Sequence, residues 1–143
     1  MESVDGETVR IGQLDLRFLV DEKQGSGDLV MFEFTVPPAA RVPVAHYHET
    51  VDEVVFGLEG TLTVTRDGEI HEIRKGDVIV IPRGCVHHHQ NLHEGISRSL
   101  VVLNPGTIGR RYFEEIASAV NVPCAPDPNR IHNIMMRYGL IPA

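Results

Sequence analysis

Short stretches rich in Val, Ile, Leu, Phe and Thr, each closed by a turn containing Gly, Pro or Asp, run along the chain to about residue 103. Apolar segments at this spacing are typical of an antiparallel β domain. The Asp67-Gly68 pair predicts a hairpin, because a type I′ turn needs positive φ at both central positions. The pattern predicts strands over 9–20, 29–36, 42–48, 52–58, 61–66, 69–74, 77–81, 86–91 and 97–103.

The pattern changes to a helical period after residues 104–106. One amphipathic helix is predicted over 111–120. A second helix follows Asp127, a good N-cap, with Pro128 preorganised at the first helical position and Gly139 past its end. We expect the apolar stripes of both helices to cover the outer sheet of the β domain or a dimer partner rather than to bind a cofactor. These stripes contain Tyr112, Phe113, Ile116, Ile131, Ile134 and Met135.

Length and charge narrow the classes of protein that fit. A chain of 143 residues suits one domain, and its formal net charge of −7 disfavours nucleic acid and anionic membranes as partners. The longest apolar stretches are too short to cross a bilayer, and residues 1–10 do not resemble a signal peptide, so we expect a cytoplasmic protein. Two cysteines, Cys85 and Cys124, exclude a disulfide framework, whereas eight histidines are many for this length.

The histidines around residue 46 carry the clearest chemical signal. In an extended strand, side chains two positions apart point to one face, so His46 and His48 project together while Tyr47 points away. Glu53 begins the next segment after a short connection, where its carboxylate can come beside the two imidazoles. A second cluster around His87 brings further imidazoles from far along the chain. Three imidazoles and one carboxylate suit Fe, Mn, Co, Ni, Cu or Zn and leave positions free for water or substrate.

The first cluster resembles one of the two signatures of the cupin family. His46 is separated by one residue from His48, which is followed after four residues by Glu53 and, after six more, by Gly60. The family pattern usually opens with a glycine six residues before the first histidine. This chain has Ala40 there, which affects only the shape of the entering turn.

The second cluster resembles the other cupin signature. Gly76 is followed after five residues by Pro82, then by Gly84, after two residues by His87, and after three more by Asn91. Two independent patterns are a far more specific signal than one short motif. The glycines suit tight turns, and the proline suits the end of a strand, so we interpret both as scaffold.

The resemblance implies an all-β fold, a double-stranded β-helix barrel of the jelly-roll type, here with two C-terminal α-helices. We expect residues 1–106 to form the barrel and residues 107–143 a helical extension packed on it within the same domain. The resemblance also implies that one divalent metal ion is bound by His46, His48, Glu53 and His87. Single-domain cupins commonly pair by sheet edges, so a homodimer is expected.

The other histidines have less specific interpretations. His88 alternates away from His87 and should face outward. His89 and Cys85 share the face of His87, and we interpret both as filling the barrel or supporting the ligands in preference to direct ligation. The remaining histidines and two acids near the ligands are expected at the surface: His71, His93, His132, Glu49 and Asp52.

The resemblance extends to cupin dioxygenases, including the quercetin dioxygenase-like group. It implies a metal-dependent oxidoreductase acting on a small enolic or aromatic molecule, with Glu53 alternating between metal ligand and proton acceptor. A metal-dependent isomerase or epimerase of a small sugar or carbonyl compound is the alternative, as is a cupin that binds a small molecule without catalysis. The nearest cations, Arg41 and Arg83, are few for a sugar phosphate.

Overall fold

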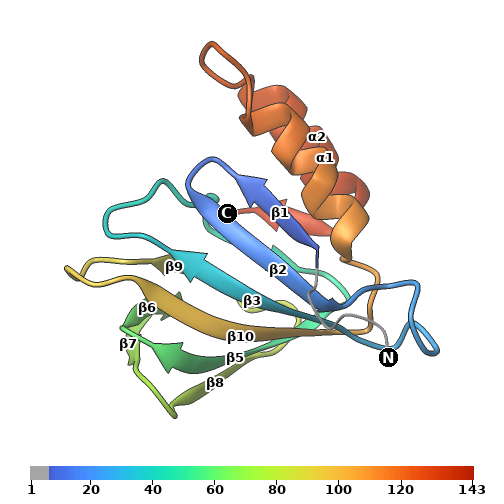
Figure 1. Ribbon diagram of the computed structural model, residues 1–143. Helices are drawn as coiled ribbons and strands as arrows, with labels where there is room; N and C mark the ends of the chain where they lie inside the picture. The colour runs from blue at the N-terminus through green and yellow to red at the C-terminus, as the bar shows by residue number, and fades with distance from the viewer. Residues whose placement is uncertain (1–6) are drawn as a thin grey trace.

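Two antiparallel β-sheets and two helices make up the fold, in a computed structural model that describes residues 7–143 (Figure 1). The strand order is β1-β2-β3-β10-β5-β8 in one sheet and β11-β4-β9-β6-β7 in the other. This confirms the expected cupin architecture. Residues 1–6 of the expected barrel lie outside the described residues. The strands are β1 (Thr8–Ile11), β2 (Leu14–Val20), β3 (Val30–Val36), β4 (His46–His48), β5 (Asp52–Glu59), β6 (Leu62–Arg66), β7 (Glu69–Ile73), β8 (Val78–Ile81), β9 (His87–Gln90), β10 (Ser97–Asn104) and β11 (Leu140–Pro142).

Two of the predicted strands differ from the observed ones. The segment predicted as one strand over 9–20 is a hairpin, because Gly12 has a φ of 59° and reverses the chain between β1 and β2. The strand predicted over 42–48 is regular only at β4, the part that carries the two histidines. A glycine inside an apolar segment was the signal for the first difference.

Turn glycines behave as the motifs predicted. Asp67 and Gly68 have φ values of 49° and 84°, so the hairpin between β6 and β7 has positive φ at both central positions. Gly60 has a φ of 64°, and a Cβ there would lie 2.1 Å from the carbonyl oxygen of Ile96. Only glycine fits such a position, because a side chain would collide with backbone.

One face of the six-stranded sheet is buried, and part of its opposite, outer face is polar. Along β3 the side chains of Phe32 and Phe34 are buried, while Glu33 between them faces outward and accepts hydrogen bonds from Arg17 and Arg98. Buried residues of both sheets belong to one hydrophobic cluster, so the core lies between the sheets. This alternation is the period of two that a half-buried strand produces.

The helices α1 (Arg110–Val120) and α2 (Pro128–Arg137) begin in different ways. The Asp127 side chain accepts a hydrogen bond from the Asn129 backbone, which confirms the predicted N-cap of α2. At α1 the N-cap is Gly109, and the free backbone N–H groups of Arg110 and Arg111 donate to the Glu22 carboxylate at 3.1 Å. A carboxylate at this end is also favoured by the helix dipole.

The helix pair lies beside β1 and β11, the two neighbouring edges of the sheets (Figure 1). Phe113 of α1 contacts the inward-facing rings of Phe18 and Phe32, with centroids 5.8 and 5.3 Å away. Tyr112, Ile116, Ile134 and Met135 are buried in the common core. The apolar stripes therefore close the side of the sandwich, whereas the expectation from the sequence was that they cover the outer sheet of the β domain or a dimer partner.

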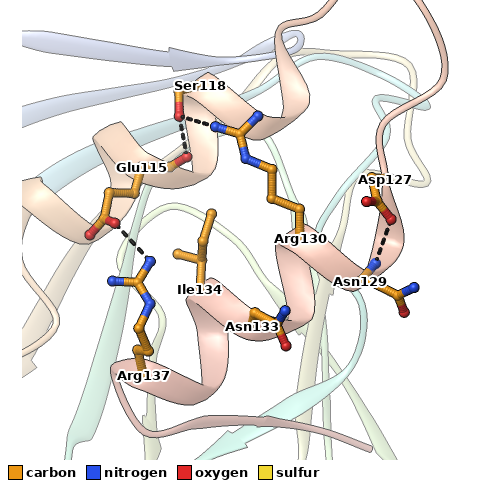
Figure 2. Close-up of a pocket in the computed structure, with 8 residues that line it drawn as sticks. All are labelled: Glu115, Ser118, Asp127, Asn129, Arg130, Asn133, Ile134 and Arg137. Carbon is orange, nitrogen blue, oxygen red and sulfur yellow. Dashed lines mark hydrogen bonds and ion pairs between the residues drawn. The ribbon is translucent and has the colours of Figure 1, made fainter.

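Ion pairs and hydrogen bonds join the two helices on their outer side, around a hollow of about 470 Å³. Arg137 contacts Glu115 at 2.9 Å, and Arg130 donates to Ser118 at 3.3 Å (Figure 2). The hollow is lined by residues of the two helices and of the segment before α2, and the histidine clusters lie elsewhere. These contacts hold α1 and α2 together as one closing element.

The end of the chain forms a strand that the sequence pattern did not predict. β11 pairs with β4, so Leu140 lies opposite His48 and Pro142 opposite His46. The short strand with the two histidines is therefore paired on both sides, with β11 on one and β9 on the other. The C-terminal segment thus helps to position the histidines.

Within residues 7–143, the two helices fall short of the length and apolar character needed to span a membrane.

Candidate metal centre

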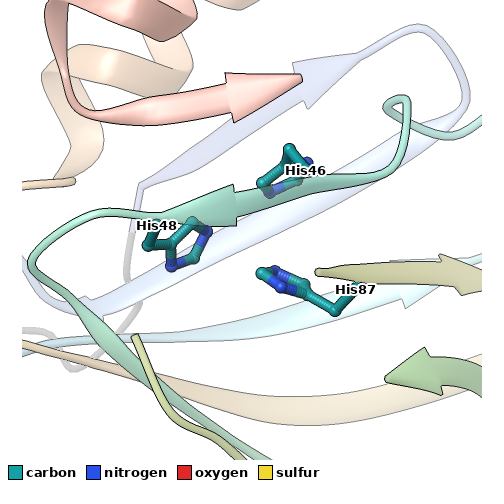
Figure 3. A group of neighbouring side chains, drawn as sticks. All are labelled: His46, His48 and His87. Atoms are coloured by element: carbon teal, nitrogen blue, oxygen red, sulfur yellow. The ribbon is translucent and has the colours of Figure 1, made fainter. Parts of the chain in front are cut away.

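Three histidines meet where β4 and β9 pair. His46 and His48 lie two residues apart on β4, and His46 is directly opposite His87 of β9. The ring centroid of His87 lies 4.7 Å from each of the other two, which are 5.2 Å apart (Figure 3). One nitrogen from each ring lies within 4.8 Å of the others. The predicted projection of His46 and His48 to one face is therefore present.

Backbone carbonyl groups orient two of the imidazole rings. The Nδ1 of His46 lies 2.8 Å from the carbonyl oxygen of Val44, and the Nδ1 of His87 lies 3.0 Å from that of Cys85. Because a carbonyl only accepts, each Nδ1 carries the proton and each Nε2 keeps its lone pair. A metal-binding histidine commonly has this arrangement, with one nitrogen fixed by the protein and the other free to coordinate.

Glu53 approaches this cluster from β5 in the opposite sheet. Its Oε1 lies 3.6 Å from Nε2 of His87 and 3.9 Å from Nε2 of His48, and its side chain is 7% exposed. Its Oε2 lies 2.7 Å from Nε2 of His89. The structure thus places Glu53 beside His87 and His48 of the histidine cluster, and it adds His89 as a partner of the carboxylate.

Burial and neighbouring charge set the protonation of the cluster. Burial, with His87 nearby, lowers the pKa of His46 to about 3, and burial lowers the pKa of His48 to about 4. Burial would raise the pKa of Glu53, but His89 and His87 hold it well below its usual range. Burial opposes protonation of His87, yet Glu53 outweighs it and raises its pKa. Neutral imidazoles and an ionised carboxylate are the forms that coordinate metals, so His46, His48 and Glu53 are held in the required form, whereas a metal would compete with a proton at His87.

A metal ion fits these residues. Nε2 of His87 is buried and has no hydrogen-bond partner among the residues that the structure describes. A buried nitrogen without a partner is costly, and a coordinated cation would use its lone pair. His46, His48 and His87 form one group that can hold an ion, and Glu53, His87 and His89 form a second, overlapping group. Imidazole and carboxylate donors suit several first-row transition metals.

Other residues near the motifs have different roles. His88 lies on β9 opposite Thr65, on the other side of the strand from His87, and is half-buried. Burial and nearby Asp67 raise the pKa of the Cys85 thiol, whereas the Cys85 carbonyl group holds His87. The expected surface residues His71 and His132 are half-buried, Glu49 and His93 are exposed, and Asp52 forms an ion pair with Arg83 at 3.1 Å.

The contact between His89 and Glu53 is what the sequence analysis did not resolve. Alternation along β9 placed His89 on the face of His87, and support of the ligands was one of its two preferred interpretations. The missing information was the distance across the interior, since Glu53 and His89 lie on different sheets. No local pattern reports how far apart two sheets lie at one point.

The fold is a small double-stranded β-helix with a histidine cluster that could hold a metal ion, and comparison with known proteins gives its family. The Cupin domain family matches residues 32–103, which is half of the chain and includes both motifs. The chain therefore belongs to the cupin family.

Among characterised relatives, the chain is 28% identical to quercetin 2,3-dioxygenase from Bacillus subtilis over 142 residues. The match covers 94% of this chain and 40% of that protein. An uncharacterised protein from Methanocaldococcus jannaschii is 35% identical over 57 residues, covering 40% of this chain and 46% of that protein. The chain thus spans less than half the length of these two relatives.

Solved structures with the same fold include proteins with different activities. The polyketide cyclase RemF from Streptomyces resistomycificus is 28% identical with a TM-score of 0.62, covering 73% of this chain and 79% of that one. A sugar phosphate isomerase of the cupin superfamily from Silicibacter pomeroyi is 26% identical with a TM-score of 0.56, covering 64% and 59%. KdgF from Halomonas sp. is 21% identical with a TM-score of 0.61, covering 73% and 94%.

Proposed function

We propose that His46, His48, Glu53 and His87 bind one divalent metal ion and that the chain is a metal-dependent dioxygenase-like enzyme. The observation that carries this proposal is the convergence of three imidazoles and one carboxylate oxygen inside the fold. The identity to quercetin 2,3-dioxygenase over nearly the whole chain supports the choice of reaction. The substrate class is a small enolic or aromatic molecule.

Each residue has a defined part in this chemistry. A bound Fe, Mn, Ni, Cu or Co ion would offer open positions to a hydroxyl or enolate group and activate it toward O₂. His46 and His87 are fixed by backbone carbonyl groups, so their Nε2 atoms keep one orientation. Glu53 Oε1 faces the same space, and Glu53 would alternate between metal ligand and acceptor of the substrate hydroxyl proton. In the overall reaction O₂ is the oxidant, and both of its atoms enter the product as the ring opens.

Metal binding is tested first, on the purified full chain. Elemental analysis should find about one transition-metal ion per chain, and His48→Ala should lose it. A metal-bound crystal should show ligand nitrogens at about 2.0–2.2 Å from the ion. His88→Ala, on β9 but facing away from the cluster, is the matched control and should keep its metal. An ordered, metal-loaded crystal in which any of the four residues turns away from the ion would contradict the ligand set.

The reaction is tested by reconstituting the metal-free chain with each candidate metal. Flavonols, catechols and 1,3-diketones are offered, and oxygen consumption is followed with an electrode. Uptake should follow metal occupancy and disappear in His48→Ala while persisting in His88→Ala. Absence of uptake with every redox-active metal would exclude the dioxygenase assignment.

The second candidate is a Lewis-acid isomerase or epimerase, which the likeness to the sugar phosphate isomerase favours. The arrangement of cations weighs against a phosphorylated substrate. The Arg83 guanidinium, one of the two cations near the motifs, is engaged with Asp52 at 3.1 Å. Interconversion of an offered aldose and ketose without oxygen uptake would select this candidate. Metal and ligand binding without turnover would instead indicate a binding cupin.

A further inference from the structure

Glu53 uses its two carboxylate oxygens for two different neighbours. Oε2 is engaged with Nε2 of His89 at 2.7 Å, while Oε1 is directed toward the Nε2 atoms of His87 and His48. An ionised carboxylate only accepts hydrogen bonds, so Nε2 of His89 is the donor. This bond fixes the rotation of the carboxylate and leaves Oε1 turned toward the imidazole cluster.

The His89 ring is itself held in place. Its side chain is 15% exposed, and the inward-facing ring of Phe34 packs against it with centroids 6.2 Å apart. Its other nitrogen, Nδ1, is buried without a hydrogen-bond partner in the described part of the chain. Glu53 is therefore the hydrogen-bond partner of this ring in the described part of the chain.

We propose that His89 is a positioning residue that holds Glu53 so that Oε1 is presented as the fourth metal ligand. This inference rests on the proposed metal site. Partners that fix a ligand without touching the metal typically change metal affinity by about 10- to 100-fold. His89 also belongs to the second group of residues that can hold an ion, so direct ligation is the competing outcome.

The test is Co²⁺ binding to the metal-free full chain, measured by calorimetry and by the visible absorption bands of Co²⁺. His89→Leu removes the hydrogen bond and should weaken binding by about 10- to 100-fold. His89→Gln restores an N–H donor toward Glu53, so it should recover most of the affinity and the wild-type spectrum. His88→Leu, on the same strand but facing the other way, is the matched control and should bind as the wild type does.

Each outcome is informative. Equal affinity and equal spectra in the wild type and His89→Leu would overturn the positioning role. A changed spectrum that Gln does not rescue would instead make His89 a ligand. Failure of the wild type to bind Co²⁺ would contradict the proposed site rather than the role of His89. If the Leu variant does not fold, as judged by thermal unfolding of the metal-free chain, His89→Ala replaces it, because a smaller side chain cannot overpack the interior.

Discussion

The histidine cluster and the closure, by which we mean α1 and α2 packed against the side of the sandwich, lie in the same interior. They consist of different kinds of side chain, polar in the cluster and apolar in the closure. The cluster buries three titratable side chains, His48, Glu53 and His87, and Nε2 of His87 has no partner among the described residues. The closure buries aromatic and aliphatic side chains of α1 and α2 in the common core, with Phe113 against the inner faces of β2 and β3. Burying polar donors costs stability, whereas burying apolar surface provides it. The closure should therefore determine whether the chain folds, and the cluster what the folded chain binds.

The two regions meet at β11. This strand follows α2 directly and pairs with β4, whose His46 and His48 belong to the cluster. The backbone N–H of Glu49 donates to the Gly139 carbonyl oxygen, and that of Gly84 to the His48 carbonyl oxygen. The cluster thus depends on the closure for its backbone geometry, although it shares few of its side-chain contacts.

The largest effect is expected from removing the closure. Truncation after Pro105 would expose Phe18 and Phe32 on the inner face of the sheet and leave β4 without its β11 partner. We expect loss of cooperative thermal unfolding and aggregation in light scattering, because a large apolar surface meets water. A truncated chain that stayed soluble with an unchanged melting temperature would make the helices a loose appendage and remove the contrast between the two regions.

Two neighbouring methionines on α2 allow the contribution of helix packing to the free energy of unfolding to be measured at single residues. Met135 is 2% exposed and Met136 is 58% exposed. Met135→Ala leaves a cavity and should lower the free energy of unfolding by about 2–5 kcal/mol. Met136→Ala should change it by less than about 0.5 kcal/mol. Urea denaturation of the metal-free chain measures both, and similar losses for the two variants would contradict the packing of α2 described above.

The sequence predicted the histidine cluster better than it predicted the surface against which the helices pack. The resemblance to the two cupin signatures pointed to His46, His48, Glu53 and His87, and the shared face of His46 and His48 could be predicted because period-two projection is a local property. The side of the sandwich that Phe113 covers could not be predicted, because an amphipathic stripe shows which face is buried and not against what.

The same limit applies to contacts between distant segments. Asp127 was recognised as the N-cap of α2 because its partner is two residues away. The cap of α1 comes from Glu22, which is 88 residues from Arg110. The pairing of β11 and the bond between His89 and Glu53 are likewise set by tertiary distance, which one sequence does not contain.

Acidification should reveal the stability cost of the cluster. The pKa values of His46 and His48 are lowered from 6.5 to about 3 and about 4. Below pH 6.5 the unfolded chain therefore binds protons that the folded chain does not, and the free energy of unfolding falls with pH. The slope is about 1 kcal/mol per pH unit for each histidine. His87, whose pKa is raised, adds stability that is fully present below 6.5 and does not alter this slope.

Urea denaturation of the metal-free chain between pH 6.5 and 5 measures this slope. The window lies above the titration of most carboxylates. His46→Gln removes one of the two groups and should reduce the slope by about half. If the variant has the same dependence of the free energy of unfolding on pH, or if the wild type becomes more stable on acidification, burial of the neutral histidines does not lower stability as expected.

The smallest effects are expected at the two helix caps, which belong to the closure and not to the cluster. Asp127→Ala should cost about 1 kcal/mol, the usual value for losing an N-cap. Glu22→Ala should cost a similar amount, because it leaves two backbone N–H groups of α1 unpaired. Glu22→Gln keeps an acceptor but loses the charge that the helix dipole favours, so its loss should be intermediate. In all three variants Co²⁺ affinity should stay within a few-fold of the wild type; a larger loss would mean that the capping of the helices, and not only the pairing of β11 with β4, sets the ligand geometry.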